Sequence, residues 1–593
     1  MTLRLAIARS VRMRARLWPQ GFVAAACVLG ACFVGGASCS GNSGHTETVP
    51  TPPAIQHAEL GTPDLRLLVV TDLKGYLEPC GCTRRPLGGI DRMAAQVASL
   101  RADGVPTVMV GAGDLFFEAP HGAGSERAGA ETQEIWKAET LVQILDRMGM
   151  AAAVPGGLDL RFGASTFADL DQRATFALLA GGVALQVPED SDAGTTDAGV
   201  NDAGTATRTL TLPAHIVVQA GGLRVGIFGV SDMVAGAGVA DGVTAPTDLE
   251  EQARTAATAL RAEGADIVIA LVRAPRRIAR RIASQINMID FVVEGGLDEA
   301  DANPPAVVEH GAILTAGRQG QALLVVDIHR RSEVNAAWTD VSTWTREVER
   351  TRLSSQIDSL RARIAEWEHD SNVAAADVQE QRTRLAELET QASALTRAPT
   401  AIGSAFEARL IELDPDAARD ASTTTIINAY SQRVNEHNRV AFASWLPEAP
   451  GEGMPHYVGS EACASCHAEE FSWWRSTAHG RAYATLEDVH KEFNLSCVGC
   501  HVTGYLQPGG ATVSHVGLLQ DVGCENCHGP GSGHIASPAE ATFNVHRDST
   551  EATCLGCHTP EHSDGFNYEA YRRIMVVPGH GLPSNGAPSG ASH

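Results

Sequence analysis

Four copies of the pattern Cys-x-x-Cys-His occur in the last quarter of the chain, and these residues carry its most specific chemistry. Two thiols three positions apart lie about one helical turn apart, so both can form thioethers to the vinyl groups of one haem. The histidine that follows is then placed to become the proximal iron ligand. The four copies therefore predict four covalently bound haem c groups. They are Cys463, Cys466 and His467; Cys497, Cys500 and His501; Cys524, Cys527 and His528; and Cys554, Cys557 and His558.

Zinc binding is the main alternative use of these cysteines, because four Cys-x-x-Cys pairs would suffice for two Cys₄ sites. A single pair could also form a redox disulfide. Neither use requires a histidine directly after every second cysteine. With 13 Cys and 21 His among 593 residues, chance placement produces one such match in roughly one chain in a hundred. Haem attachment is therefore the favoured interpretation.

Residues 1–39 predict an export signal with a lipidation site. Five arginines within the first 16 residues precede a run of small apolar residues from Gly21 to Ala37, as in a signal peptide. Cys32 and Cys39 each end a segment that resembles a bacterial lipobox. A leucine three residues earlier favours Cys32, whereas cleavage at Cys39 leaves no orphan cysteine in the mature chain. An uncleaved membrane anchor is the alternative, although the run is short and rich in glycine for a bilayer span.

Length and charge limit the number of domains and the kind of partner. About 550 mature residues exceed what one hydrophobic core holds, so two or three domains are expected beyond a flexible tether at residues 40–62. The formal net charge of -24 argues against a nucleic-acid partner, and haem propionates would add to it. The expected partners of an exported haem protein are a periplasmic electron donor and a periplasmic electron acceptor.

Residues 63–330 predict a layered α/β domain. Short apolar segments of the kind found in buried strands alternate with longer amphipathic segments of helical spacing. Residues 189–207 contain three Asp-Ala-Gly triplets and lack apolar side chains able to fill a core, so they predict a disordered loop. The predicted strands are 65–71, 107–111, 223–230, 267–272, 291–294 and 323–328, and the predicted helices are 91–101, 138–148 and 249–261.

Two motifs in this domain resemble the first two metal motifs of the calcineurin-like metallophosphoesterases, and in particular of their 5'-nucleotidase branch. They are Thr71-Asp72-Leu73-Lys74-Gly75 and Gly111-Ala112-Gly113-Asp114. The resemblance implies a pocket in which aspartates and histidines hold two divalent metals that activate water. Asp72 and Asp114 match the aspartates of that pattern.

The remaining ligand positions depart from the family pattern. Lys74 stands where the first histidine is expected, Gly157 stands near an expected Asn-His pair, and Arg273 and Gly296 replace two further histidines. A lysine ammonium cannot ligate a metal and repels a dication. We therefore expect no divalent metal and no hydrolysis, with an ion pair from Lys74 to the vacated carboxylates in place of the metal. Residual or altered hydrolysis is the alternative.

Cys80 and Cys82 follow the first motif closely and form a possible thiol site. Two cysteines one residue apart could form a strained disulfide, bind a soft metal or handle a sulfur compound. An incidental pair in a tight glycine turn is the alternative.

Residues 345–398 carry apolar side chains at heptad spacing in two stripes of about 20 residues. The pattern predicts an antiparallel helical hairpin or a coiled-coil seam that joins two chains in a dimer. The simplest role is a spacer between domains, followed by a helical linker at 399–451. The stripes are Leu353, Ile357, Leu360, Ile364 and Trp367, then Val378, Leu385, Leu388, Ala392 and Leu395.

Residues 452–593 resemble the tetrahaem cytochrome c-552/4 family. The matching segments, in addition to the haem motifs, are 457–460, 476–479 and 524–534. The resemblance implies a mostly helical domain with closely packed haems, several of them ligated by two histidines, and it makes His479 and His534 the best distal ligands. His580 is a third candidate, ahead of His490, His515, His546 and His562. Methionine ligation is expected to be rare because the region contains only two methionines.

These observations predict an exported, lipid-anchored electron carrier with an inactive phosphoesterase-like domain used for docking or binding. One alternative is a multihaem reductase of a small nitrogen or sulfur compound, acting at a haem that lacks a distal ligand. The other is a 5'-nucleotidase-like hydrolase at the N-terminal pocket.

Overall fold

The computed structural model describes most of the chain after residue 59. The described residues are 60–79, 85–119, 129–188, 207–233, 242–296, 302–331, 337–401, 403–538, 545–546, 549–559, 563 and 565–575. The predicted signal peptide, both lipidation candidates, Cys80, Cys82, His562 and His580 lie outside them, as does the predicted loop apart from its last residue, Thr207, which begins a strand.

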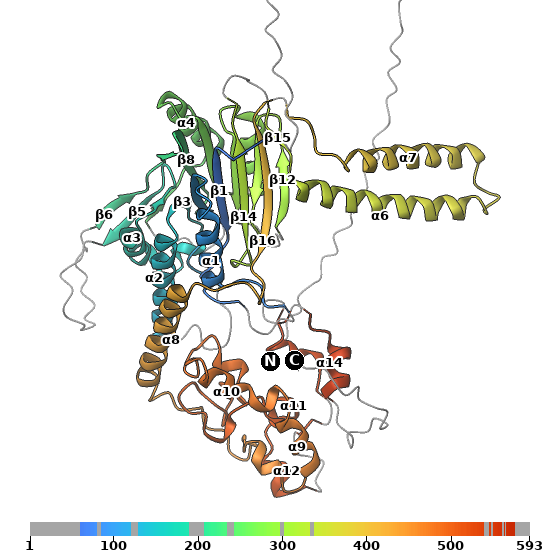
Figure 1. Ribbon diagram of the computed structural model, residues 1–593. Helices are drawn as coiled ribbons and strands as arrows, with labels where there is room; N and C mark the ends of the chain where they lie inside the picture. Colours follow the sequence, from blue (N-terminus) through green and yellow to red (C-terminus); the bar gives the residue numbers. More distant parts are fainter. Residues whose placement is uncertain are drawn as a thin grey trace, which may run out of the picture. The chain divides into compact units, whose positions relative to one another are not determined.

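Two large sheets pack face to face in the α/β part of the chain (Figure 1). The first sheet has the order β15-β16-β14-β1-β2-β3-β4, and the second has the order β12-β13-β11-β10-β8-β7. The first sheet contains β1 (Leu65–Thr71), β2 (Thr107–Ala112), β3 (Met150–Val154), β4 (Ala177–Leu178), β14 (Ala322–His329), β15 (Thr339–Asp340) and β16 (Ala405–Glu412). The second contains β7 (His215–Ala220), β8 (Leu223–Ser231), β10 (Ile267–Arg273), β11 (Phe291–Gly295), β12 (Asn303–Val307) and β13 (Ala312–Thr315).

The alternation of side chains along the central strands explains the packing. In β1, Leu65, Leu67 and Val69 face the second sheet, while Leu68 and Val70 face the helices on the other side. Because both faces are covered, the strand is apolar along nearly its whole length, as a buried parallel strand should be. Leu67 is opposite Val108 of β2, to which β1 is parallel.

Helices cover both outer faces and complete four layers. The first sheet is covered by α1 (Ile90–Arg101), α2 (Glu131–Arg147), α3 (Gly163–Arg173) and α8 (Ala421–Ala441), and the second by α4 (Leu249–Ala262) and α5 (Arg276–Gln285). A small sheet of β5 (Ala184–Pro188), β6 (Thr207–Thr211) and β9 (Val243–Thr244) lies beside them. The predicted fold class, a layered α/β sandwich followed by a mostly helical region, is confirmed.

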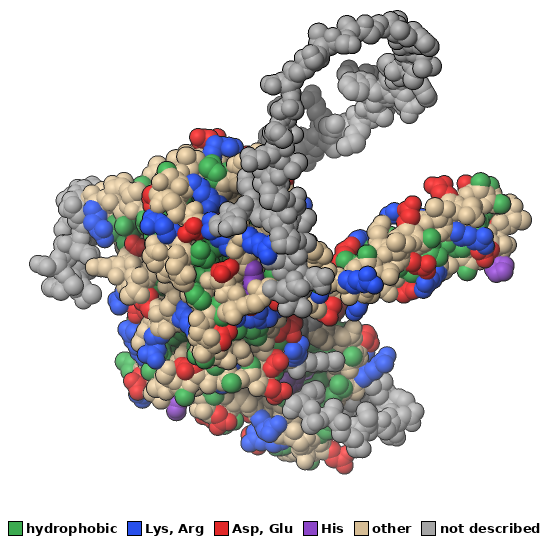
Figure 2. Space-filling view, turned by 45° about the horizontal axis from the view of Figure 1, so that its top comes forward, with side chains coloured by type: hydrophobic (Ala, Val, Ile, Leu, Met, Phe, Trp, Pro, Cys, Tyr) green, Lys and Arg blue, Asp and Glu red, His purple; other side chains and the backbone are tan. Residues whose placement is uncertain are grey.

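The segment 345–398 is a helical hairpin of α6 (Thr343–Trp367) and α7 (Ala375–Ala394), whose apolar stripes pack against each other. It is not a spacer between domains, because it is inserted between β15 and β16 of one sheet. Figure 1 shows it extending away from the sheets, and Figure 2 shows acidic and basic side chains intermixed along it. A solvated outer surface of this kind suits a hairpin that buries its apolar stripe internally.

The prediction of a helical linker at 399–451 was wrong for its first part. Residues 405–412 form β16, which pairs with β14 over eight residues and with β15 on its other side. Its side chains alternate, with Phe406 and Ala408 in the core and Glu407 and Arg409 between them. This period of two favours a strand, and the helical segments on both sides of it obscured the signal. The later part of the predicted linker is helical, because it contains α8.

The C-terminal part consists of short helices and turns. They are η3 (Ser460–Cys463), α9 (Ala468–Arg475), η4 (His479–Arg481), α10 (Ala482–Glu487), η5 (Val498–Cys500), η6 (Gly517–Leu519), α11 (Cys524–His528), α12 (Ser532–Ala536), α13 (Glu551–Leu555) and α14 (Tyr568–Met575). The apolar cluster here is small and includes Leu495, Val498, Val502 and Val513. An apolar core this small is expected for a segment whose interior would be filled largely by bound porphyrins.

Candidate haem sites and the Arg273 pocket

The haem motifs adopt the local geometry that their spacing predicts. The third motif is one complete helix, α11, from Cys524 to His528. In the first and fourth motifs the backbone N–H of the histidine donates to the backbone carbonyl oxygen of the first cysteine, at 3.0 Å for His467 and 2.9 Å for His558. Each of these bonds closes one helical turn, which brings both thiols and the imidazole of a motif together.

In three of the four motif histidines the Nδ1 atom is hydrogen-bonded. His501 Nδ1 lies 2.6 Å from the carbonyl oxygen of Ala482, and His528 Nδ1 lies 2.6 Å from that of His546. His558 Nδ1 lies 3.0 Å from Ser563 Oγ. Such a bond fixes the tautomer and directs Nε2 toward a metal, as in most histidine ligands of metalloproteins. These residues therefore fit the role of proximal iron ligands.

Two predicted distal ligands lie opposite motif histidines. The ring centroids of His467 and His534 are 6.4 Å apart with an interplanar angle of 33°, and those of His479 and His558 are 6.2 Å apart at 49°. A metal bonded at about 2 Å to one nitrogen of each ring places two facing imidazole centroids on the order of 6 Å apart. Burial also lowers the pKa of His479 and His558, which favours the neutral imidazole that ligates a metal.

The other two motif histidines differ from these. Among the described residues, no histidine ring is found facing His501, whose ring instead contacts Ala482 and Thr485. His515, a weaker distal candidate, is bonded through Nδ1 to the carbonyl oxygen of Trp445 at 3.0 Å. His546 accepts the bond from His528 through its backbone. The structure thus pairs His534 and His479 with partners and leaves the remaining distal ligands as predictions.

Cysteines of different motifs also meet. The side chains of Cys463 and Cys524 are hydrogen-bonded to each other, and those of Cys500 and Cys557 form a second such pair. The first motif therefore adjoins the third, and the second adjoins the fourth. Haems attached at adjoining motifs would lie close together, which electron transfer between them would require.

In the α/β domain, charged residues gather where strands of both sheets end. Asp72 follows β1, Asp114 follows β2, Asp232 follows β8, and Arg273 is the last residue of β10. Asp72 and Asp114 are 2% and 3% exposed. Because the carboxyl ends of these parallel strands lie at one edge of the sandwich, the side chains converge there.

Arg273 provides the positive charge of this pocket. Its guanidinium binds Asp114 Oδ2 at 3.2 Å and Asp232 Oδ1 at 2.6 Å. Burial would lower the pKa of Arg273, but these two carboxylates outweigh it and raise the pKa. The expectation that Lys74 would pair with the vacated carboxylates of Asp72 and Asp114 was wrong, because within the described part of the chain Lys74 forms no ion pair with either of them. The longer, planar Arg273 reaches Asp114 from the opposite sheet and Asp232 from the neighbouring strand of its own sheet.

Asp72 is held by backbone amides. Gly296 N donates to both of its carboxylate oxygens, at 2.8 and 2.9 Å, and Asp114 N donates at 3.3 Å. Gly113, with φ of +97°, makes this approach possible, since a Cβ there would lie 2.1 Å from Asp72 Oδ1. Amides and an arginine thus occupy the surroundings that metal-ligating histidines would need.

Asp159 was missed by the sequence reasoning. It is 1% exposed and accepts hydrogen bonds from the backbone N–H groups of Leu115, Phe116 and Gly156. Burial and the neighbouring Asp114 raise its pKa to about 7. Its position five residues after the end of β3, next to Gly156-Gly157, was the available signal. No cluster of three or more metal-ligating side chains occurs among the residues that the structure describes.

Residues 462–529 match the protein family described as "Cytochrome c554 and c-prime". The C-terminal segment is thus similar to c-type cytochromes. The chain is 38% identical over 91 residues to cytochrome c-554 of Nitrosomonas europaea, which covers 13% of this chain and 39% of that protein. The chain thus spans well under half the length of this curated relative. The predicted resemblance to this family is confirmed for residues 462–529, and the family match implies covalently bound haem c, whereas the number of haems stays a prediction.

Solved structures with some similarity to this chain include a 5'-nucleotidase precursor and a sulfate thiohydrolase. The 5'-nucleotidase precursor of Thermus thermophilus is 17% identical, with a TM-score of 0.40, and covers 62% of this chain and 59% of that one. The sulfate thiohydrolase SoxB of the same organism is 14% identical, with a TM-score of 0.40, and covers 63% and 61%. At these values the likeness carries no functional conclusion. In the described part of the chain, no helix has both the length and the apolar character needed to cross a membrane.

Proposed function

We propose that this protein is an exported, multihaem electron carrier. The observation that supports this most directly is the pair of facing imidazoles at two motifs, His467 with His534 and His479 with His558. Iron held between two imidazoles cycles between Fe(III) and Fe(II) without an open coordination position. Such a site transfers electrons and binds no substrate at the metal. Four haems, one per motif, complete the proposal.

The α/β domain is proposed to be catalytically inactive. Arg273 binds Asp114, and amides surround Asp72, so the pocket has positive charge and donors where a metal would need ligands. A fixed guanidinium also repels a dication. The domain then serves to bind or dock, and the hydrolase alternative has no support from the geometry.

The proposed location and partners rest on sequence patterns alone. We propose export by the N-terminal signal, lipidation at Cys32 or Cys39, and exchange of electrons with soluble periplasmic proteins. The apolar stripe that predicted a hairpin or a dimer seam is used within one chain, between α6 and α7. A dimer through the outer surface of the hairpin stays a prediction.

The test is to count and classify the haems of the purified full-length protein. Haem that stays with the polypeptide after acid-acetone extraction, at four per chain, and low-spin EPR signals from at least two haems support the carrier. Extractable haem, or high-spin signals from all four, would contradict it.

A second function is favoured by one observation. Since no described histidine ring faces His501, the haem at the second motif is the candidate for an open iron position, as a reductase of a small nitrogen or sulfur compound requires. A high-spin signal that disappears when nitric oxide or cyanide binds would support this function. Absence of any high-spin haem would contradict it.

A further inference from the structure

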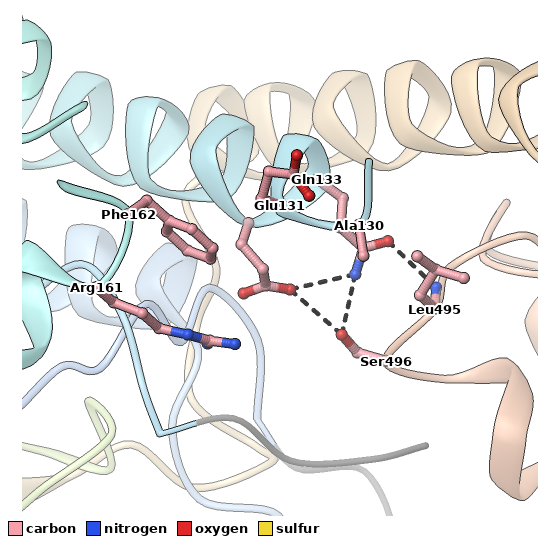
Figure 3. A pocket seen from close by; sticks show the side chains of 8 residues that line it. Ala130, Glu131, Gln133, Arg161, Phe162, Leu495 and Ser496 are labelled. Atoms are coloured by element: carbon pink, nitrogen blue, oxygen red, sulfur yellow. Dashed lines mark hydrogen bonds between the residues drawn. The ribbon is translucent and has the colours of Figure 1, made fainter. Parts of the chain in front are cut away.

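The residues directly before the second haem motif are hydrogen-bonded to the start of α2, near Leu495 and Ser496 (Figure 3). Gln133 Oε1 accepts a hydrogen bond from Leu495 N at 3.2 Å, and Gln133 Nε2 donates to Ser496 Oγ at 3.0 Å. Ser496 Oγ in turn donates to Glu134 Oε1 at 3.3 Å. Ser496 directly precedes Cys497, so these bonds act on the residue next to a haem-attachment site.

A second set of bonds fixes the same segment against α8. Asn438 Nδ2 donates to the carbonyl oxygen of Phe493 at 3.0 Å and to Gln133 Oε1 at 3.0 Å. Asn435 donates to Glu492 Oε1 at 2.8 Å and accepts from Phe493 N at 3.0 Å. Residues 492–496 are therefore held by two helices, and the haem motif that follows has a defined place beside α2.

Buried charged side chains lie beside residues 492–496. Lys137 Nζ is 3.0 Å from Glu134 Oε2 and 3.7 Å from Glu118 Oε1, and the three side chains are only 14–16% exposed. Burial lowers the pKa of Lys137, but Glu134 and Glu118 outweigh this and raise it. Burial raises the pKa of Glu134, but Lys137 outweighs this and lowers it. Both groups are therefore charged at neutral pH.

These charges are close enough to Cys497 to interact with it electrostatically. Burial raises the pKa of the Cys497 thiol, Lys491 and Lys137 oppose this, and Glu78 adds to it, so Lys137 is one of several charges near this cysteine. Together with the link from Lys137 through Glu134 to Ser496, this puts an ion pair of the α/β domain next to the second haem site. Burying charges has a desolvation cost that a purely structural contact could avoid with apolar residues.

We propose that Lys137 and Glu134 set the reduction potential of the haem bound at Cys497 and Cys500, so that the α/β domain supplies the charges that tune this haem. The proposal rests on the electron-transfer function above. A nearby positive charge stabilises the reduced haem, which carries one more electron, and a negative charge destabilises it. At roughly 10 Å and an effective dielectric constant of about 20, one charge changes the equilibrium constant of reduction by on the order of tenfold.

The test is a redox titration of the full-length holoprotein and two variants, followed by visible absorption and EPR. Lys137→Met should lower the potential of one haem and Glu134→Gln should raise it, each by about tenfold in the equilibrium constant, which is about 59 mV for one electron. The affected haem should be the one whose spectrum changes in a His501→Met reference variant. The other three should keep their potentials.

Glu139→Gln is the matched control, because Glu139 is on the same helix but pairs with Arg173 and Arg433. It should shift no haem. If Lys137→Met fails to fold, Glu134→Gln decides alone, since it keeps the side-chain size and Lys137. Unchanged potentials in a folded variant with four haems would overturn the proposal and leave the carrier function intact. Loss of reversible reduction in the wild type would instead count against the carrier.

Discussion

The imidazole rings of His467 and His534 face each other with their centroids 6.4 Å apart, although 67 residues separate them in the sequence. The first motif places His467 at the start of α9, and the short helix α12 carries His534. Hydrogen bonds from His456 N to Ser532 Oγ at 2.8 Å and from Gly531 N to Glu525 Oε1 at 2.7 Å attach the start of α12 to residue 456 and to the third motif. One iron atom would complete this pair.

Replacing either distal histidine should open one haem and leave the others unchanged. In His534→Ala and His479→Ala, one haem of four should become high-spin, because a single imidazole remains on its iron. All four should stay covalently attached, since the thioethers are untouched. EPR and haem counting measure these outcomes. His369→Ala, at an exposed position just after α6, is the control and should change no spin state; unchanged EPR spectra in both distal variants would refute the assignment.

Removing the guanidinium of Arg273 should destabilise the α/β domain strongly. Arg273→Ala leaves the buried Asp114 and the partly buried Asp232 without their positive partner, which costs about 3–5 kcal/mol. Chemical denaturation measures the change in the free energy of unfolding. Arg254→Ala, which breaks only an exposed pair with Glu251, should cost about 1 kcal/mol or less. An equal effect of the two substitutions would contradict the role given to Arg273.

The stability of the α/β domain should fall as the pH rises from about 4 to 7. The folded pKa of Asp159, about 7, exceeds its usual value of 3.8, so the folded state keeps a proton that the unfolded state has lost. The stabilisation that this proton gives the folded state is complete below the unfolded pKa, and it is lost as the pH rises through the folded pKa of about 7. The slope should reach about 1.4 kcal/mol per pH unit for this one group.

Asp114→Asn tests the cause of this slope. It removes the neighbouring negative charge, so the pKa of Asp159 should fall and the stability profile between pH 4 and 7 should flatten. Denaturation at several pH values gives the slope, which is the relevant quantity because the substitution also weakens the pair with Arg273. A slope as steep as that of the wild type would show that another group titrates.

Deleting the hairpin should leave the cytochrome intact. Replacing residues 345–398 with a short Gly-Ser linker removes most of α6 and α7, while β15 and β16 keep their direct pairing. We expect four haems per chain, unchanged reduction potentials and lower helix content by circular dichroism. Loss of haem or a shifted potential would mean that the hairpin supports the cytochrome after all.

The sequence was most informative where one short segment carries the whole signal. Strands such as β1 and β10 were predicted within one residue, because their apolar run is local, as is the spacing that defines each haem motif. Arg273, Asp232 and Asp159 were harder to interpret, since each gains its role from strands brought together by folding. Lys74 was the wrong cation for the same reason. Only the two-sheet geometry determines which side chain reaches Asp114.

The position of β16 has a consequence for the order in which the protein matures. The chain emerges from its N-terminus during synthesis, and the seven-stranded sheet is incomplete until residue 412 is available. Residues 421–441 then add α8, and the first haem motif follows at Cys463. The surface of α2 and α8 that receives residues 492–496 can thus be finished before the cysteines are joined to haem. The α/β domain then works as a template on which the haem-binding part assembles.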